Sequence, residues 1–169
     1  VMRNLVIICG DQLDHAASAL DGFDPSQDAV WMAEVHHEAT HVWCHKLRLA
    51  YFFSAMRHFR EDLRGRGITV QYHELSADAS KDRGSTFSEI LISDFKRLKP
   101  SQLIMTEPGD DRVLREFTEA ARKIKVPLDV RPDRHFYCSR EDCAKYAKGK
   151  KSLLLEFFYR DQRKKYRVL

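Results

Sequence analysis

The sequence predicts an α/β fold in which helices cover both faces of a doubly wound, five-stranded parallel sheet with strand order 3-2-1-4-5. Short apolar runs alternate along the chain with longer segments whose apolar residues have helical spacing. The length of 169 residues, of which 43% are hydrophobic and 32% charged, is typical of one globular core. Right-handed crossovers between successive strands then give three layers, α/β/α.

Five apolar runs are predicted to be the strands. They are rich in valine, isoleucine and leucine, and most are bounded by glycine, proline, aspartate or serine. Near-continuous hydrophobicity is typical of strands that are buried on both faces of a parallel sheet. The predicted strands are residues 4–9, 29–34, 69–74, 102–106 and 128–130.

Three segments between the strands are predicted to be helices, namely residues 46–66, 86–98 and 110–123. In the first, apolar side chains recur at i, i+3, i+4 and i+7, and Gly65 and Gly67 end the pattern. The arginines on its remaining faces are expected to be solvated, as charged helix faces usually are. They are Arg48, Arg57, Arg60 and Arg64.

Two further helices, residues 140–148 and 152–167, are predicted after the last strand. We expect residues 1–135 to form the α/β domain and residues 136–169 a helical extension that continues into, or docks on, a following domain. The basic end of the second helix is a candidate for an interdomain or DNA-phosphate contact. Its residues are Arg160, Arg163 and Lys164, with Lys165 and Arg167.

Composition limits the cellular setting. The 29 lysines and arginines exceed the 25 acidic residues by four, an excess that permits an anionic partner without requiring one. No apolar run approaches the roughly 18 residues of a membrane span, so no membrane partner is expected. Four cysteines are too few for a disulfide scaffold, and Cys9 lies in an apolar run as a buried thiol would. We therefore expect a cytoplasmic protein.

Polar residues follow three of the predicted strands. Gly10-Asp11-Gln12-Leu13 follows the first strand, Glu34 and Glu38 follow the second, and Glu107-Pro108-Gly109 follows the fourth. Doubly wound sheets bind ligands at these carboxyl ends. The carboxylates, and the lack of any G-x-G-x-x-G or G-x-x-x-x-G-K-[ST] motif, favour an uncharged heterocycle over a nucleoside triphosphate. The alternative is that these residues only cap helices and brace turns.

The segment His37-Glu38-Ala39-Thr40-His41 matches H-E-x-x-H, in which two histidines bind zinc and the glutamate activates a water. It directly follows a predicted strand, whereas the zinc motif lies within a long helix, so we interpret it as the polar start of a helix at the crevice. Cys138-x4-Cys143 with Cys44 is a second candidate set, at the upper limit of zinc-knuckle spacing. We predict no metal site, and keep a zinc-dependent hydrolase using His37, Glu38 and His41 as an alternative.

Six groups of residues form an ordered pattern along the whole chain. They are Gly10-Asp11-Gln12-Leu13; Ala33-Glu34-Val35 with Glu38-Ala39; His45-Lys46; Ser54-Ala55-Met56-Arg57-His58-Phe59; Thr106-Glu107-Pro108-Gly109; and Gly149-Lys150-Lys151-Ser152 with Glu156-Phe157-Phe158-Tyr159-Arg160. This pattern resembles the amino-terminal part of the deoxyribodipyrimidine photolyase-related proteins, also called iron–sulfur bacterial cryptochromes and photolyases.

The resemblance implies a Rossmann-like antenna domain that binds 6,7-dimethyl-8-ribityllumazine. It also implies that FAD, a 4Fe-4S cluster and the lesion site belong to a larger helical domain that this chain lacks. The full protein would be a light-driven lyase repairing UV photoproducts of the (6-4) type, or a related photoreceptor. Its partners would be its own carboxyl-terminal catalytic domain and UV-damaged DNA, and this chain alone is expected to be inactive.

The matching positions imply a chromophore site on the strand ends, with the bulky Phe52 facing the pocket from the long helix. The implied site residues are Gly10, Asp11, Gln12, Leu13, Glu34, Glu38, Phe52, Glu107 and Gly109. A lumazine ring offers N–H and carbonyl groups to carboxylate and backbone partners. Without a following domain, the chain would instead be a free-standing small-ligand-binding α/β module.

Overall fold

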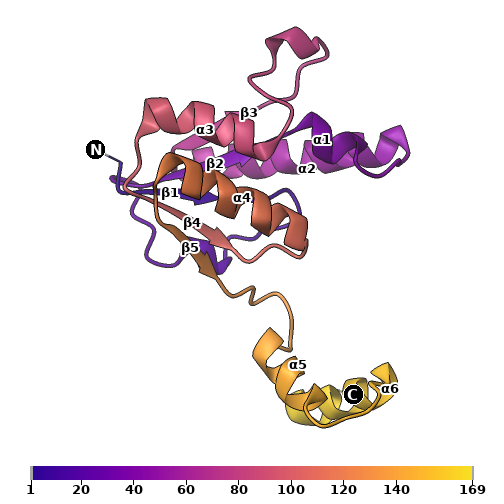
Figure 1. The fold of residues 1–169 in the computed structure, drawn as a ribbon. Coiled ribbons are helices and arrows are strands. Elements are labelled where there is room, and N and C mark those ends of the chain that lie inside the picture. Colours follow the sequence, from indigo (N-terminus) through magenta and orange to yellow (C-terminus); the bar gives the residue numbers. More distant parts are fainter. Residues whose placement is uncertain (1, 169) are drawn as a thin grey trace. The chain divides into compact units, whose positions relative to one another are not determined.

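The computed structural model describes residues 2–168 and divides the chain into two compact units, Val1–Arg131 and Pro132–Leu169. The first unit contains a five-stranded sheet of order β3-β2-β1-β4-β5, and every neighbouring pair is parallel (Figure 1). The strands are β1 (Asn4–Ile7), β2 (Ala29–Ala33), β3 (Val70–His73), β4 (Gln102–Thr106) and β5 (Leu128–Arg131). The predicted α/β class and strand order are confirmed.

The helices of the first unit cover both faces of the sheet, α3 and α4 on one and α2 on the other (Figure 1). A short helix, α1, follows β2 directly. The bounds are α1 (His36–Thr40), α2 (Lys46–Gly65), α3 (Phe87–Leu98) and α4 (Asp111–Ile124), with 3-10 turns η1 (Ser18–Leu20) and η2 (Ala79–Lys81). The sequence pattern missed α1 as a complete helix, and both 3-10 turns, because a single turn is too short to show periodicity.

Alternate residues of the central strands enter opposite layers of the core. Leu5 and Ile7 pack with α3 and α4, whereas Val6 and Ile8 pack with α2. These four side chains are at most 3% exposed, as expected for a strand buried on both faces. The expectation fails at β5, where Val130 is 38% exposed, because an edge strand has one flank without a neighbour.

Local signals set the helix ends. The Thr86 hydroxyl accepts a hydrogen bond from the Glu89 amide, and the Asp110 carboxylate accepts one from the Arg112 amide. Both contacts satisfy amides that the first helical turn leaves without a backbone partner. At the end of α2, Gly67 takes a positive φ of 77°, which glycine adopts at little cost. The chain thereby turns directly into β3.

The second unit contains two helices, α5 (Arg140–Ala147) and α6 (Leu155–Tyr166). The Ser139 hydroxyl caps α5 by accepting from the Asp142 amide, and Lys165 of α6 pairs with Asp142 at 2.9 Å. Helix α6 ends at Tyr166, because Arg167 takes a φ of 55° in the left-handed region. Within residues 2–168, no helix combines the length and apolar character that crossing a membrane requires.

Candidate functional site

A cavity of about 220 Å³ lies at the carboxyl ends of β1 and β2, the position that the topology predicts for a ligand. Its walls come from the segments that follow these strands and from α1, α2, α3 and the start of α4. The lining residues are Cys9, Gly10, Asp11, Ala33, Glu34, Val35, Glu38, Phe52, Phe53, Met56, Phe87, Pro108, Asp110 and Val113. Segments far apart in the sequence therefore form one hollow.

One side of the cavity is apolar and tightly packed around Gly10. A Cβ atom at this position would lie 2.6 Å from Cε1 of Phe52 and 2.7 Å from Sδ of Met56. Glycine is thus required here by the close approach of α2 to the loop after β1. Cys9, next to it, is a buried free thiol as predicted, and burial raises its pKa.

Charged side chains also line the cavity. The Glu38 carboxylate accepts two hydrogen bonds from the Arg112 guanidinium, at 2.7 and 3.0 Å, and Arg112 also pairs with Asp110 at 3.2 Å. The hydrogen bond from Arg112 to Glu38 raises the pKa of the guanidinium. Asp11 completes the acidic lining. The sequence interpretation missed Arg112, which pairs with the lining residues Glu38 and Asp110 without lining the cavity itself, and no local sequence signal indicates this pairing.

The predicted site residues divide into two groups. Gly10, Asp11, Glu34, Glu38 and Phe52 line the cavity. The other four residues do not line it. Two of these, Gln12 and Leu13, contact other parts of the protein instead. The four residues are Gln12, whose amide nitrogen donates to the carbonyls of Thr106 and Glu107 at 3.4 and 3.0 Å; Leu13, which packs on the α2 side of the core; Glu107; and Gly109.

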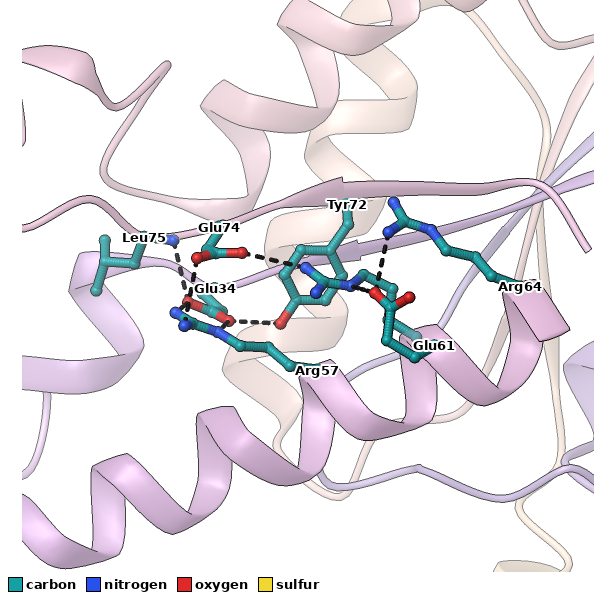
Figure 2. A network of polar contacts seen from close by, with 8 residues as sticks. Glu34, Arg57, Glu61, Arg64, Tyr72, Glu74 and Leu75 are labelled. Atoms are coloured by element: carbon teal, nitrogen blue, oxygen red, sulfur yellow. Dashed lines mark hydrogen bonds and ion pairs between the residues drawn. The ribbon is translucent and has the colours of Figure 1, made fainter.

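The Glu34 carboxylate is bound to protein groups, although the residue lines the cavity. Its oxygens accept hydrogen bonds from Arg57 at 2.7 and 2.8 Å, from the Tyr72 hydroxyl at 2.5 Å and from the Leu75 amide at 3.0 Å (Figure 2). Burial raises the pKa of Glu34, but these hydrogen bonds outweigh it and lower the pKa below its usual value. Glu34 therefore acts as a link between β2, β3 and α2.

The same network corrects the prediction of a solvated arginine face on α2 for Arg57 and Arg60, whereas Arg48 and Arg64 are exposed as predicted. Arg57 bridges Glu34 and Glu74 (Figure 2). Arg60 contacts Glu61, Glu74 and the ring of Tyr72. The side chain of Arg60 is only 17% exposed. Helical spacing shows that an arginine lies off the apolar stripe, but it does not show which strand that face contacts. The network fixes α2, which carries Phe52 and Met56, against the sheet.

Three buried side-chain atoms in the segments that follow β1, β2 and β4 have no hydrogen-bond partner, although none of their residues lines the cavity. They are Oε1 of Gln12, Nδ1 of His37 and Nε of Arg112. Buried polar atoms are nearly always paired, and an unpaired one costs about 1–3 kcal/mol. Each of these three atoms has the capacity for one further hydrogen bond.

The H-E-x-x-H segment forms α1 and ends at its cap residue, His41. The rings of His37 and His41 lie 5.5 Å apart, centre to centre. Glu38, which a zinc hydrolase would use to activate water, binds Arg112 with both oxygens. The interpretation of this segment as a helix start at the crevice agrees with the structure. The structure does not favour the zinc-hydrolase alternative, because the glutamate that would activate water is paired with Arg112.

The basic residues at the carboxyl end lie on α6 of the second unit. Arg160 pairs with Glu156 at 2.7 Å, and the Arg163 guanidinium lies 5.7 Å from the centre of the Tyr159 ring. Lys164 is exposed. The same unit has an apolar groove of about 720 Å³ between the segment around Tyr137 and α6.

Comparison with known proteins extends these observations. Residues 6–169 match the family model described as deoxyribodipyrimidine photo-lyase-related protein. A protein of Agrobacterium fabrum (strain C58 / ATCC 33970) named "(6-4) photolyase" is 43% identical over 166 residues. The match covers 97% of this chain and 32% of that protein, so the chain spans about a third of its relative's length. The chain belongs to the deoxyribodipyrimidine photolyase-related protein family.

Proposed function

We propose that this chain is the amino-terminal antenna and scaffold part of a light-driven, FAD-dependent DNA photolyase that acts on UV photoproducts of the (6-4) type. Family membership and the relative named (6-4) photolyase support the class of protein. The observation that carries the antenna role is the cavity at the strand ends, which is lined by the apolar side chains of Phe52, Phe53 and Met56 and by the carboxylates of Asp11 and Glu38. A second chromophore can pass excitation energy to a flavin when the protein holds it at a fixed distance and orientation, and the edge of a sheet is a rigid place to hold it.

The proposed ligand of this cavity is 6,7-dimethyl-8-ribityllumazine, which would absorb the light. Its flat ring suits the apolar wall of Phe52, Phe53 and Met56, and its N–H and carbonyl groups suit Asp11 and the Glu38–Arg112 pair. The cavity is smaller than the roughly 300–1,000 Å³ usual for small-molecule sites. Because Phe52 is 38% exposed at the cavity, its ring is the side chain we expect to move when the chromophore binds.

FAD, a 4Fe-4S cluster and the lesion site are proposed to belong to the part of the protein that corresponds to the rest of the relative's length. FAD would supply the electron that opens the photoproduct. This chain would contribute the antenna site and a docking surface, so we expect no repair activity from it alone.

The second unit is the proposed contact with DNA or with the catalytic domain. Arg160, Arg163 and Lys164 lie within four residues of one another on α6, and clustered cations of this kind attract the phosphate backbone of DNA. The surrounding sequence adds further lysines, including Lys150 and Lys151. Such contacts are sequence-independent and weaken as salt rises.

Titration with the lumazine tests the proposed antenna role. We expect a saturable change in ligand absorbance or fluorescence, and we expect Glu38→Gln to weaken binding several-fold because it breaks the ion pair that borders the cavity. Glu119→Gln is the matched control, since Glu119 is an exposed residue of α4 outside the cavity. The absence of any spectral change at high ligand concentration would exclude the antenna role for this cavity.

A further inference from the structure

A histidine and two glutamates converge at the outer edge of α1. His37 and Glu38 belong to α1, and Glu116 comes from α4. One ligand atom from each, the imidazole nitrogen and two carboxylate oxygens, lies within 4.8 Å of the others. We infer that these three residues form a binding site for a divalent transition-metal ion of the zinc class, which would join α1 to α4.

The imidazole of His37 is prepared for such a contact. Its Nδ1 atom is buried and has no hydrogen-bond partner, although the side chain as a whole is 43% exposed. The nearest carboxylate oxygen, Oε1 of Glu38, lies 3.8 Å from Nδ1, which is beyond hydrogen-bond range. A bound cation would satisfy this nitrogen, because neutral imidazole is a strong ligand for transition metals.

The two carboxylates retain the capacity to bind a metal. Glu116 accepts a hydrogen bond from the Ser88 amide through Oε1 at 2.8 Å. Glu38 binds Arg112 with both oxygens, yet an ionised carboxylate has about four acceptor positions. Arg112 pairs with Glu38 and Asp110, and Arg112 and Arg115 line one hollow with Asp111, Glu116 and Glu119. Five carboxylates thus outnumber two guanidinium groups, and the local charge favours a further cation.

The ligand set determines the class of ion. Zinc binds imidazole nitrogen and carboxylate oxygen at about 2.0–2.2 Å, which places two ligand atoms of one ion about 3.3–3.6 Å apart. The 3.8 Å between Nδ1 and Glu38 Oε1 must shorten only slightly, and the ligand atoms of the cluster, which lie within 4.8 Å of one another, must close by about 1.2–1.5 Å at most. Magnesium prefers oxygen ligands alone and would compete poorly for a site that includes a histidine.

This site differs from the zinc-hydrolase motif in the same segment. Glu38 would be a metal ligand instead of a base, and the third ligand would be Glu116 in place of His41. The consequence is structural. Helix α1 spans five residues and has no side-chain cap at its start, so a metal clamp to α4 would hold it at the edge of the cavity. The inference does not depend on which ligand occupies that cavity.

Calorimetric titration of the chain with Zn²⁺ tests the inference. We expect one ion per chain, and at least tenfold weaker binding in His37→Ala and in Glu116→Gln. Glu116→Gln keeps the oxygen that accepts from Ser88, so it should fold normally. His36→Ala is the matched control, because His36 is the exposed neighbour on the same helix and lies outside the cluster. A hundredfold excess of Mg²⁺ should leave the titration unchanged.

Two further measurements separate this site from others. With Co²⁺ in place of Zn²⁺, ligation by nitrogen and oxygen gives no thiolate charge-transfer band, whereas ligation by Cys138 and Cys143 would give one. Zn²⁺ should also raise the melting temperature of the wild type but not of His37→Ala. Lack of stoichiometric binding, unchanged affinity in His37→Ala, or a thiolate band would each overturn the inference. Lumazine binding is measured separately with a chelator present, so that failure of the metal site and failure of the proposed antenna role can be told apart.

Discussion

Two glutamates that follow the same strand, Glu34 and Glu38, have different roles. Glu34 is 1% exposed, and its carboxylate accepts four hydrogen bonds from Arg57, Tyr72 and Leu75. Glu38 is partly exposed, lines the cavity and pairs with Arg112. The same residue type at one strand end therefore holds the fold together in one position and borders a binding site in the other. Burial and the number of fixed donors decide between these roles.

The largest expected effect comes from breaking the Glu34 network. Glu34→Gln places an amide NH2 group among the donors from Arg57, Tyr72 and Leu75, and it leaves Arg57 with only the exposed Glu74 carboxylate as an ion-pair partner. Since Arg57 is itself 39% exposed, we expect a loss of about 3 kcal/mol, the lower end of the cost of breaking a buried ion pair. Denaturant unfolding followed by the fluorescence of buried Trp31 would measure it.

Glu38→Gln is the comparison for that experiment. Its ion pair is partly solvated, so we expect a loss of stability below about 1 kcal/mol, with the main effect on lumazine binding. Equal losses of stability in the two variants would contradict the division of roles between Glu34 and Glu38.

Tyr72→Phe should have a smaller effect on the same network. It removes one donor to Glu34 but leaves Arg57 and the Leu75 amide in place. Burial, together with the hydrogen bond to Glu34, raises the pKa of Tyr72, so the hydroxyl stays protonated and donates at neutral pH. We expect a loss of about 1–2 kcal/mol in the same unfolding assay. An unchanged free energy of unfolding would contradict this expectation and mean that the other donors to Glu34 compensate for the missing hydroxyl.

The pH dependence of stability should also reflect Glu34. Its pKa in the folded protein is below the usual value of about 4.3, so the unfolded chain binds the proton more readily. The stabilisation is therefore complete above about pH 4.3 and is lost as the pH falls through the folded pKa. Glu34→Gln should show a shallower decline in unfolding free energy below pH 4.3 than the wild type. Parallel curves would show that other carboxylates, such as Asp28 beside Arg3, dominate the acid range.

The smallest expected effect concerns the size of the cavity. Phe52→Leu shortens the side chain that faces Gly10, and we expect lumazine to bind a few-fold more tightly with little change in stability, because Phe52 is partly exposed. Gly10→Ala should do the opposite, since its Cβ would collide with Phe52 and Met56. The two dissociation constants, measured by fluorescence, would show whether Phe52 limits access. Tighter binding in Gly10→Ala would contradict this interpretation.

The sequence by itself determined the order and type of the main elements. Strands such as β1 and β2 are apolar at consecutive positions, and that pattern forces burial on both faces whatever the rest of the chain does. Glycine and capping residues determined the helix ends, because their effects act within one turn. Asp11, Glu38 and Gly10 could be assigned to the crevice because strand ends in a parallel sheet lie at a common edge.

Only the tertiary structure decided which polar groups meet. Tyr72 lies 38 positions from Glu34, and Arg112 lies 74 positions from Glu38. Pairing over such separations depends on how strands and helices pack, and local spacing contains no information about it. For the same reason Glu107 appeared equivalent to Glu38 in the sequence but does not line the cavity, and Arg57 and Arg60 appeared solvated but bind carboxylates. Hydrophobic patterning acts locally and fixes the framework, whereas the chemistry of the site depends on contacts that form when the whole sheet is assembled.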